Sequence, residues 1–134
     1  MSAGERVAAA ARALVGVRFR PQGRSAETGL DCIGVVALAA GVPIERVPAD
    51  YVLRMDDPAR MRAGFMSAGF GEVAGDARPG DVLVVRAGWG QAHAVVLTTD
   101  GFVHADARLR RVVEVPGAVG WPIVGAWRVK DGRS

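Results

Sequence analysis

The residues of this chain best suited to covalent chemistry are its single cysteine, Cys32, and its only two histidines, His93 and His104. A thiol beside an imidazole is the minimum equipment of a cysteine hydrolase, because the imidazole takes the thiol proton and later returns it to the leaving group. The cysteine lies early in the chain and both histidines lie far downstream. The fold must therefore bring them together, and the elements that carry them come first.

Cys32 stands where a helix is expected to begin. Asp31 is a favourable N-cap, and the apolar run after it continues to Ala40 and stops at Gly41. A helix over 32–40 would be apolar all round and therefore buried. Its N-terminal partial charge would favour the thiolate, and its free N–H groups could serve an oxyanion. Gly34 would allow a substrate or a sheet to approach closely. The plainer alternative is a cysteine that only packs.

The two histidines fall on neighbouring predicted strands joined by a hairpin turn at Asp100-Gly101. With these two residues in the turn, His104 faces Leu97, four residues after His93. Four is even, so both rings project from one face, but about 13 Å apart along a flat strand. Strong twist, a bulge or a wider turn must bring them together. Asp106, on the same face, is a further candidate for orienting His93.

Helices followed by strands predict an α+β fold. Besides the cysteine helix, we expect an amphipathic helix over 5–15 and a third opened by Asp56-Asp57-Pro58. The expected strands are 82–86, 93–99, 102–105, 111–115 and 125–130. They predict a mostly antiparallel sheet of about five strands, with the N-terminal helices packed on it.

Composition limits the classes open to this protein. The chain has 134 residues, half of them apolar, which fits one domain over 1–134 with a buried core. A lone cysteine forms no internal disulfide, and no apolar run reaches the roughly 20 residues of a membrane span. The N-terminus lacks the features of a signal peptide, so we expect synthesis in the cytoplasm.

The basic balance is weak support for a nucleic-acid partner. Seventeen basic residues against fourteen acidic ones give a net charge of +3, and Lys130 is the only lysine. The arginines are scattered, and no aromatic residues alternate with them to stack bases. The one tight cluster is interrupted by Leu109 and consists of Arg108, Arg110 and Arg111. We therefore expect no specific nucleic-acid binding.

Four short blocks resemble those of the NlpC/P60 cysteine peptidases and occur in the same order. They are Asp31-Cys32-Ile33-Gly34, Pro79-Gly80-Asp81-Val82, His93-Ala94-Val95-Val96-Leu97 and Phe102-Val103-His104-Ala105. The loop 16–29 also resembles the segment that precedes the cysteine in that family. Together the blocks span nearly the whole chain and contain its only cysteine and both histidines.

The resemblance implies a papain-like α+β fold and hydrolysis of amide bonds in the stem peptides of bacterial peptidoglycan. Cys32 would be the nucleophile, His93 the base and His104 the third, orienting residue, with no metal or organic cofactor. The short chain is most similar to the phage-tail branch, including the peptidases of gene-transfer-agent particles. The implied partners are then wall peptides and phage-like tail proteins, and the protein would open the cell envelope for DNA entry as part of the particle.

Some positions depart from the family pattern. Many members carry a tyrosine where this chain has Phe19, and Gln91 is a candidate to replace its hydroxyl. Ile33 stands where a serine is usual. Trp89, between two glycines near His93, is a candidate to line the substrate groove, whereas Trp121 and Trp127 are expected to pack. The full set of candidate substrate-binding or oxyanion residues is Phe19, Asp31, Gln91 and Trp89, although Asp31 is best interpreted as a cap.

Other functions remain open at this stage. The chain could be a catalytically weak or inactive tail-tip or assembly protein that keeps the same fold. Cys32, His93 and His104 could instead supply three zinc ligands with a water as the fourth, although their spacing matches no short metal motif. An acyltransferase or amidase would use the same nucleophile and base. Arg18, Arg20 and Arg24, before the cysteine, could meet stem-peptide carboxylates, but a solvated loop is the plainer interpretation.

Overall fold

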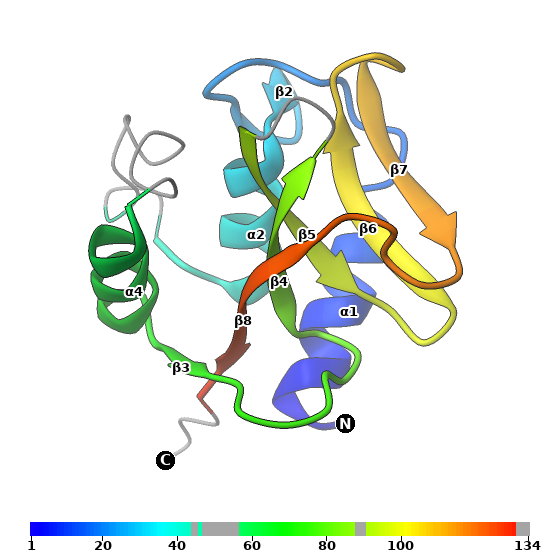
Figure 1. Cartoon of the computed structure of the whole chain (residues 1–134). Helices are drawn as coiled ribbons and strands as arrows, with labels where there is room; N and C mark the ends of the chain where they lie inside the picture. Colours follow the sequence, from blue (N-terminus) through cyan, green and yellow to red (C-terminus); the bar gives the residue numbers. More distant parts are fainter. Residues whose placement is uncertain (44–45, 47–56, 88–90, 131–134) are drawn as a thin grey trace.

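A computed structural model of the chain describes residues 1–43, 46, 57–87 and 91–130. The helices within these ranges are α1 (Ala3–Ala13), α2 (Cys32–Ala40) and α4 (Pro58–Ser67). The short strands are β1 (Arg24–Ser25), β2 (Gly29–Leu30) and β3 (Phe70–Glu72). The longer strands are β4 (Val82–Ala87), β5 (Gln91–Leu97), β6 (Gly101–Asp106), β7 (Arg111–Pro116) and β8 (Ile123–Val129). Figure 1 shows the helices gathered beside the sheet.

The main sheet has six strands in the order β3-β8-β4-β5-β6-β7, and every neighbouring pair is antiparallel. Strands β4 to β7 follow one another as hairpins, and β8 returns to lie between β3 and β4. The predicted α+β class and antiparallel sheet are confirmed. The five predicted strands correspond to β4 to β8, and the described residues add the three-residue strand β3 at one edge of the sheet. A separate two-stranded sheet, β1-β2, precedes α2.

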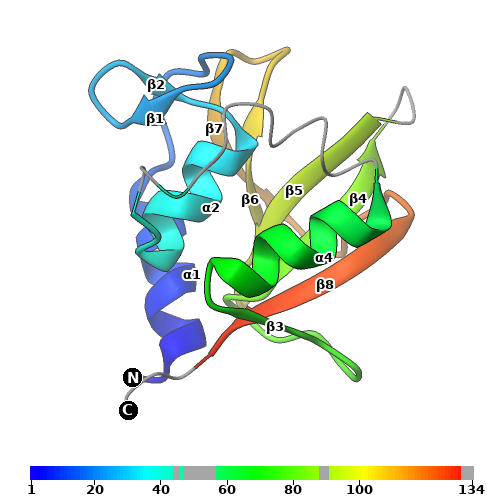
Figure 2. The same cartoon turned by 90° about the vertical axis from the view of Figure 1, so that its left-hand side faces the viewer.

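The three helices pack on one face of the sheet (Figure 2). The main core joins α2 to the inward residues of β4, β5 and β6, with Ala94 and Val103 among its buried members. A smaller core on the opposite face contains Val95 and Phe102 and is covered by the segment around Trp121. The sheet is thus buried on both faces near β5, the strand that carries His93. No helix in the described ranges is long and apolar enough to cross a membrane.

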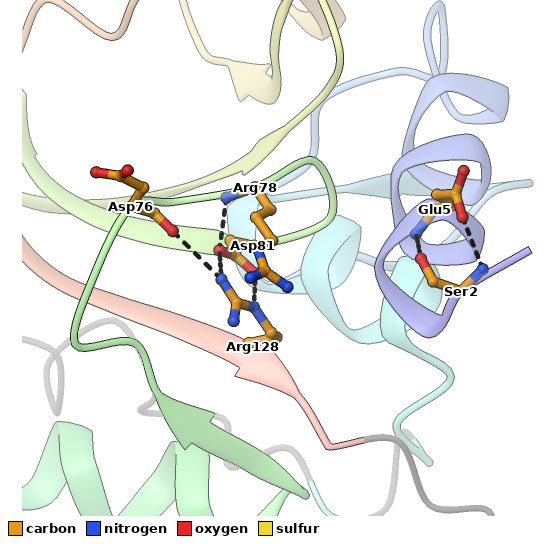
Figure 3. Close-up of polar contacts among 6 residues, drawn as sticks. All are labelled: Ser2, Glu5, Asp76, Arg78, Asp81 and Arg128. Carbon is orange, nitrogen blue, oxygen red and sulfur yellow. Dashed lines mark hydrogen bonds and ion pairs between the residues drawn. The ribbon is translucent and has the colours of Figure 1, made fainter.

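Local capping explains where the helices begin. Asp31 accepts a hydrogen bond from the backbone N–H of Gly34, so the predicted cap of α2 is confirmed. Asp57 caps α4 in the same way, ahead of Pro58. Helix α1 begins earlier than the predicted residue 5, because Ser2 and Glu5 form a reciprocal capping box (Figure 3).

Asp81, from the second family-like block, has a structural role. Its carboxylate is almost fully buried and accepts two hydrogen bonds from the Arg128 guanidinium, at 2.8 and 2.9 Å. It also accepts the backbone N–H of Arg78, as Figure 3 shows. This paired hydrogen bond connects the turn before β4 to β8. The second family-like block therefore stabilises the sheet at the end remote from Cys32.

Gly34 allows the loop before β1 to approach the start of α2 closely. A Cβ at this position would lie 2.2 Å from the carbonyl oxygen of Gly23 and 3.0 Å from Leu30. The backbone of the loop before β1 therefore packs directly on the first turn of α2. Any side chain here would push the loop away from the helix that carries Cys32.

The variant Gly34→Ala should consequently lower the free energy of unfolding by about 1–3 kcal/mol. Chemical denaturation followed by circular dichroism measures this. Gly75→Ala is the matched control, because a Cβ at Gly75 meets nothing within 4 Å and its backbone angle is not in the left-handed region. Equal stability of the two variants would contradict the close packing of this loop on α2.

Candidate active site

Cys32 is the first residue of α2, and its side chain is 7% exposed. The backbone N–H groups of Ala94 in β5 and of Ile33 are hydrogen-bonded to the sulfur and favour the thiolate. The cap Asp31 carries a nearby negative charge that favours the thiol instead. The thiol therefore lies between the N-terminus of a helix and the strand that carries His93.

Burial dominates the protonation of this thiol. Desolvation raises the pKa of Cys32 to about 11, and the Asp31 charge adds to the rise, whereas Ala94, Arg24 and Ile33 oppose it. The N–H of Ile33 at the helix N-terminus lowers this pKa, as the sequence predicts, but burial outweighs that contribution, so the predicted net preference for the thiolate is wrong. Partial charges at a helix end are worth about 1 kcal/mol or less, which is too little to offset removal of a thiolate from water. The resting site holds a neutral thiol.

The two histidines meet directly. Nε2 of His93 lies 2.9 Å from Nδ1 of His104, and the rings are nearly perpendicular. The predicted register of the β5-β6 hairpin was wrong, because Phe102 faces Leu97 rather than Thr99. Continuing the observed register sets His104 opposite residue 95, so the histidines are diagonal neighbours within reach of each other. The prediction that both histidine rings project from one face of the sheet is confirmed. The predicted offset of four residues between His93 and the residue opposite His104 is corrected to two.

The physical cause of this register is the position of Gly101. A Cβ there would overlap the carbonyl oxygen of Val115, so the glycine is needed inside the β6-β7 pair rather than in the turn. Its N–H bonds to Oγ1 of Thr98, and its carbonyl accepts the N–H of Thr98. The turn residues are therefore Thr99 and Asp100, one position earlier than the Asp-Gly signal predicted.

An acidic side chain lies near the ring nitrogen of His104 that does not contact His93, beyond hydrogen-bond distance. Nε2 of His104 lies 4.0 Å from Oδ2 of Asp106. With Nε2–H of His93 donating to His104, Nδ1 of His93 keeps a free lone pair and is the nitrogen able to accept a thiol proton. Burial, and then the charge of His104, lower the pKa of His93 to about 4, although Asp106 and Asp31 oppose the shift. Burial also lowers the pKa of His104, with Asp106 opposing.

Trp121 contacts both histidines, which goes beyond the prediction that this residue only packs. Its ring is edge-on to His93, His104 and Phe102, with centroids 5.9, 5.6 and 6.0 Å away. It lies in the segment between β7 and β8 and shields the hydrogen bond of the histidines from water. No local pattern around residue 121 marks this contact, since it depends on how the segment crosses the sheet. Trp127, in contrast, is a core residue stacked on Phe65, as predicted.

The other candidate residues have different positions. Asp31 is a buried cap that also accepts the guanidinium of Arg24 at 2.7 Å and the N–H of Gln22. Phe19 is half-buried against the main core, next to Leu30 in a parallel bridge. Gln91 is exposed at the start of β5. Trp89 lies outside the described residues.

The zinc alternative gains no support from this geometry. Among the described residues, no group of three or more His, Cys, Asp or Glu side chains is arranged to hold a metal. The facing nitrogens of His93 and His104 are engaged with each other rather than directed at a common point. Two imidazoles joined by a hydrogen bond can accept and pass on a proton, and transfer from the Cys32 thiol is part of the proposal for the function.

The pKa shifts of His93 and Cys32 predict that the free energy of unfolding is highest between about pH 6.5 and 9 and falls on both the acid and the alkaline side. The pKa of His93 is lowered from 6.5, so the unfolded chain binds more protons as pH falls from 6.5 toward 4, and stability is lost there. The pKa of Cys32 is raised from 9.0, so the unfolded chain releases its proton first and stability falls as pH rises from 9 toward 11. Each limb amounts to about 3 kcal/mol when fully developed.

Denaturant unfolding across pH 4–11 measures this profile. The variant His93→Gln should flatten the acid limb, and Cys32→Ala should flatten the alkaline limb. A wild-type profile that stays level from pH 6.5 down to 4 would show that the imidazole is not buried in its neutral form.

Comparisons with known proteins give the fold. No family model matches the sequence, and neither does any curated protein. Solved structures do match. NlpC1 from Trichomonas vaginalis superimposes with a TM-score of 0.68 at 17% identity, and NlpC2 from the same organism with 0.62 at 17%. The P60 domain of the antigen MAP1204 from M. avium subspecies paratuberculosis gives 0.59 at 16%.

The chain has an NlpC/P60-like fold. Each superposition covers 95% of the chain, so the likeness concerns the fold of nearly the whole chain. The chain spans less than half of the two Trichomonas structures, 44% and 46%, and 93% of the P60 domain. The structural neighbours are NlpC/P60 proteins, and this agrees with the family indicated by the four sequence blocks. At these identities the likeness concerns the fold, and the roles of individual residues belong to the proposal below.

Proposed function

We propose that this chain is a cysteine peptidase that hydrolyses amide bonds in the stem peptides of bacterial peptidoglycan. The observation that carries the proposal is the 2.9 Å hydrogen bond between His93 and His104, on the strand whose Ala94 N–H contacts the Cys32 sulfur. The four family-like blocks and the NlpC/P60-like fold support the same conclusion. The group uses the chain's only cysteine and both of its histidines.

In the proposed reaction, Nδ1 of His93 takes the thiol proton while the sulfur attacks the scissile carbonyl carbon. The tetrahedral intermediate collapses when His93 gives that proton to the leaving amine, and a thioester to Cys32 remains. Water, deprotonated by His93, then attacks the thioester, and release of the acid restores the thiol. Because the resting thiol is neutral, proton transfer accompanies attack instead of preceding it. His104, with Trp121 against its ring, accepts the Nε2–H of His93, so that Nδ1 of His93 remains the base.

The test is incubation of the protein with purified wall fragments, followed by mass spectrometry of the products. New free amino and carboxyl ends within stem peptides, absent with a Cys32→Ala variant, support the proposal and identify the bond. Wall fragments that remain intact under conditions where the protein is folded would refute it.

A catalytically inactive structural protein is the second candidate, and two observations favour it. Cys32 packs with Ala92 and Ala94 on the helix side of β5, whereas the ring contacts of His93 lie on the Trp121 side. The high pKa of the thiol is also unlike that of an activated nucleophile. Alkylation with iodoacetamide at neutral pH, compared between the wild type and His93→Gln, separates the candidates. A thiol that gives its proton to His93 should react more slowly in the variant, whereas an inert core thiol should react slowly and equally in both proteins.

We infer further that the protein works as part of a phage-like tail that opens the envelope for DNA entry. The support is the resemblance, stated from the sequence, to the phage-tail branch of the NlpC/P60 peptidases. Mass spectrometry of purified particles from the producing cell tests this setting. Absence of the chain from such particles would refute it without affecting the proposed chemistry.

A further inference from the structure

Two groups of arginines that are far apart in the sequence are neighbours in the fold. One group lies in the loop before β1 and the other at the turn between β6 and β7. Arg18 and Arg111 are partners in an antiparallel bridge, and the N–H of Phe19 donates to the carbonyl of Arg110 at 3.0 Å. We call the exposed members of both groups the arginine patch, which consists of Arg18, Arg20, Arg108, Arg110 and Arg111.

The patch carries five positive charges at the protein surface. None of its five guanidinium groups forms an ion pair with an acidic residue in the part of the chain that the structure describes. Other arginines do find such partners, as Arg12 does with Glu114 and Arg24 with Asp31. Bridge partners project from the same side of the backbone, so Arg18 and Arg111 face each other as like charges. Asp106, the strand partner of Arg111 in β6, supplies one negative charge beside these two guanidinium groups and offsets the repulsion only in part. An anion from outside the chain would relieve that repulsion.

Hydrogen bonds connect the segments that carry the patch to residues close to Cys32 and to His104. The loop residues Arg18 and Arg20 are hydrogen-bonded through their backbones to Leu30, two residues before Cys32, at 2.9 and 3.1 Å. On the histidine side, Asp106 lies 4.0 Å from His104 and accepts the N–H of Arg108 at 2.8 Å. Figure 1 shows β7 starting beside the loop toward β1, at the end of the molecule where α2 begins.

We propose that the arginine patch binds the free carboxylates of peptidoglycan stem peptides that flank the peptide being cut. This inference rests on the proposed function. A guanidinium donates two parallel hydrogen bonds to a carboxylate, so five of them form a surface suited to a strand with repeated carboxylates. Bound next to Cys32, such a strand would supply one scissile peptide after another at high local concentration.

Nucleic acid is the less favoured anion for this surface. Proteins that hold single strands combine basic residues with exposed aromatic rings on which bases stack. The only aromatic residue in segments 18–20 and 108–111 is Phe19, and its ring packs against the main core. The patch also adjoins a candidate hydrolytic group, which favours a ligand on which that group acts.

The test compares two triple variants with the same net charge. Arg18, Arg108 and Arg111→Gln removes three patch charges, and Arg6, Arg60 and Arg62→Gln removes three exposed charges on α1 and α4, away from the patch. The ligands are a soluble wall fragment with several stem peptides and the same fragment with its carboxylates amidated. Binding is measured at low and high salt with Cys32→Ala added to every protein, so that ligands stay intact, and thermal melts verify folding.

We expect the patch variant to bind the carboxylate fragment roughly tenfold more weakly than the charge-matched control, since each exposed ion pair adds up to about 1 kcal/mol. Its binding should also lose most salt dependence and the preference for free over amidated carboxylates. Equal binding by the two triple variants, or equal wild-type affinity for the amidated fragment, would overturn the inference. Tighter patch-dependent binding of a DNA duplex would overturn it in favour of nucleic acid.

Cleavage by the same proteins with Cys32 present keeps this inference separate from the proposed function. Charge-dependent binding without cleavage refutes only the peptidase. Cleavage with charge-independent binding refutes only the patch.

Discussion

Replacement of Cys32 by alanine should lower kcat for wall-peptide hydrolysis by at least about 10³-fold, to the background of the assay. The reason is covalent, because without the sulfur no thioester forms and the remaining groups only bind the substrate. The expected change in folding is small, since the side chain is short and its loss removes a weakly hydrogen-bonded buried atom. The measurement is release of peptide ends against time, with circular dichroism to verify the fold.

Cys32→Ser is the matched control for this prediction. It keeps a side chain of similar shape at the start of α2 but replaces the thiol with a hydroxyl that ionises far less readily. It should therefore be nearly as inactive as the alanine variant. Full activity of either variant would exclude the cysteine mechanism and leave a different nucleophile to be found.

Replacement of His93 by glutamine should lower kcat by about 10²–10⁴-fold, the usual worth of a general base. Glutamine keeps a polar group near His104 but cannot accept the thiol proton at neutral pH. Because the thiol has a pKa of about 11, the variant should recover activity as pH rises toward that value, where the thiolate forms without a base. The wild type should instead be level from about pH 6 to 9. Steady-state rates across pH provide the measurement.

His104→Gln provides the comparison for the His93 variant. An orienting residue acts through His93, so its loss should cost less than loss of the base, and the shape of the pH profile should move toward that of free imidazole. An effect of His104→Gln as large as that of His93→Gln, with no recovery in either variant at high pH, would contradict the assigned roles.

Much of the fold and the identity of the candidate group follow from local signals. Asp31, Gly41 and the apolar run between them predict α2 correctly, since capping and burial pattern act over a few neighbouring residues. The strand predictions place His93 and His104 on one face for the same reason, because side chains alternate along any strand. The four family-like blocks add the order in which these elements occur.

The sequence determined which residues stand at the start of the cysteine helix and on the histidine strands, and it determined the local caps. Only the tertiary structure decided the register of β5 and β6, since Gly101 is set by contact with β7 and not by its turn propensity. The tertiary structure likewise decided that the thiol is buried, that Trp121 lies beside the histidines and that the two groups of arginines are neighbours. Each of these depends on contacts between distant segments. The energies of these contacts depend on which surfaces are buried from water and which charges lie close together. Both are decided by how distant segments pack on the two faces of the sheet near β5.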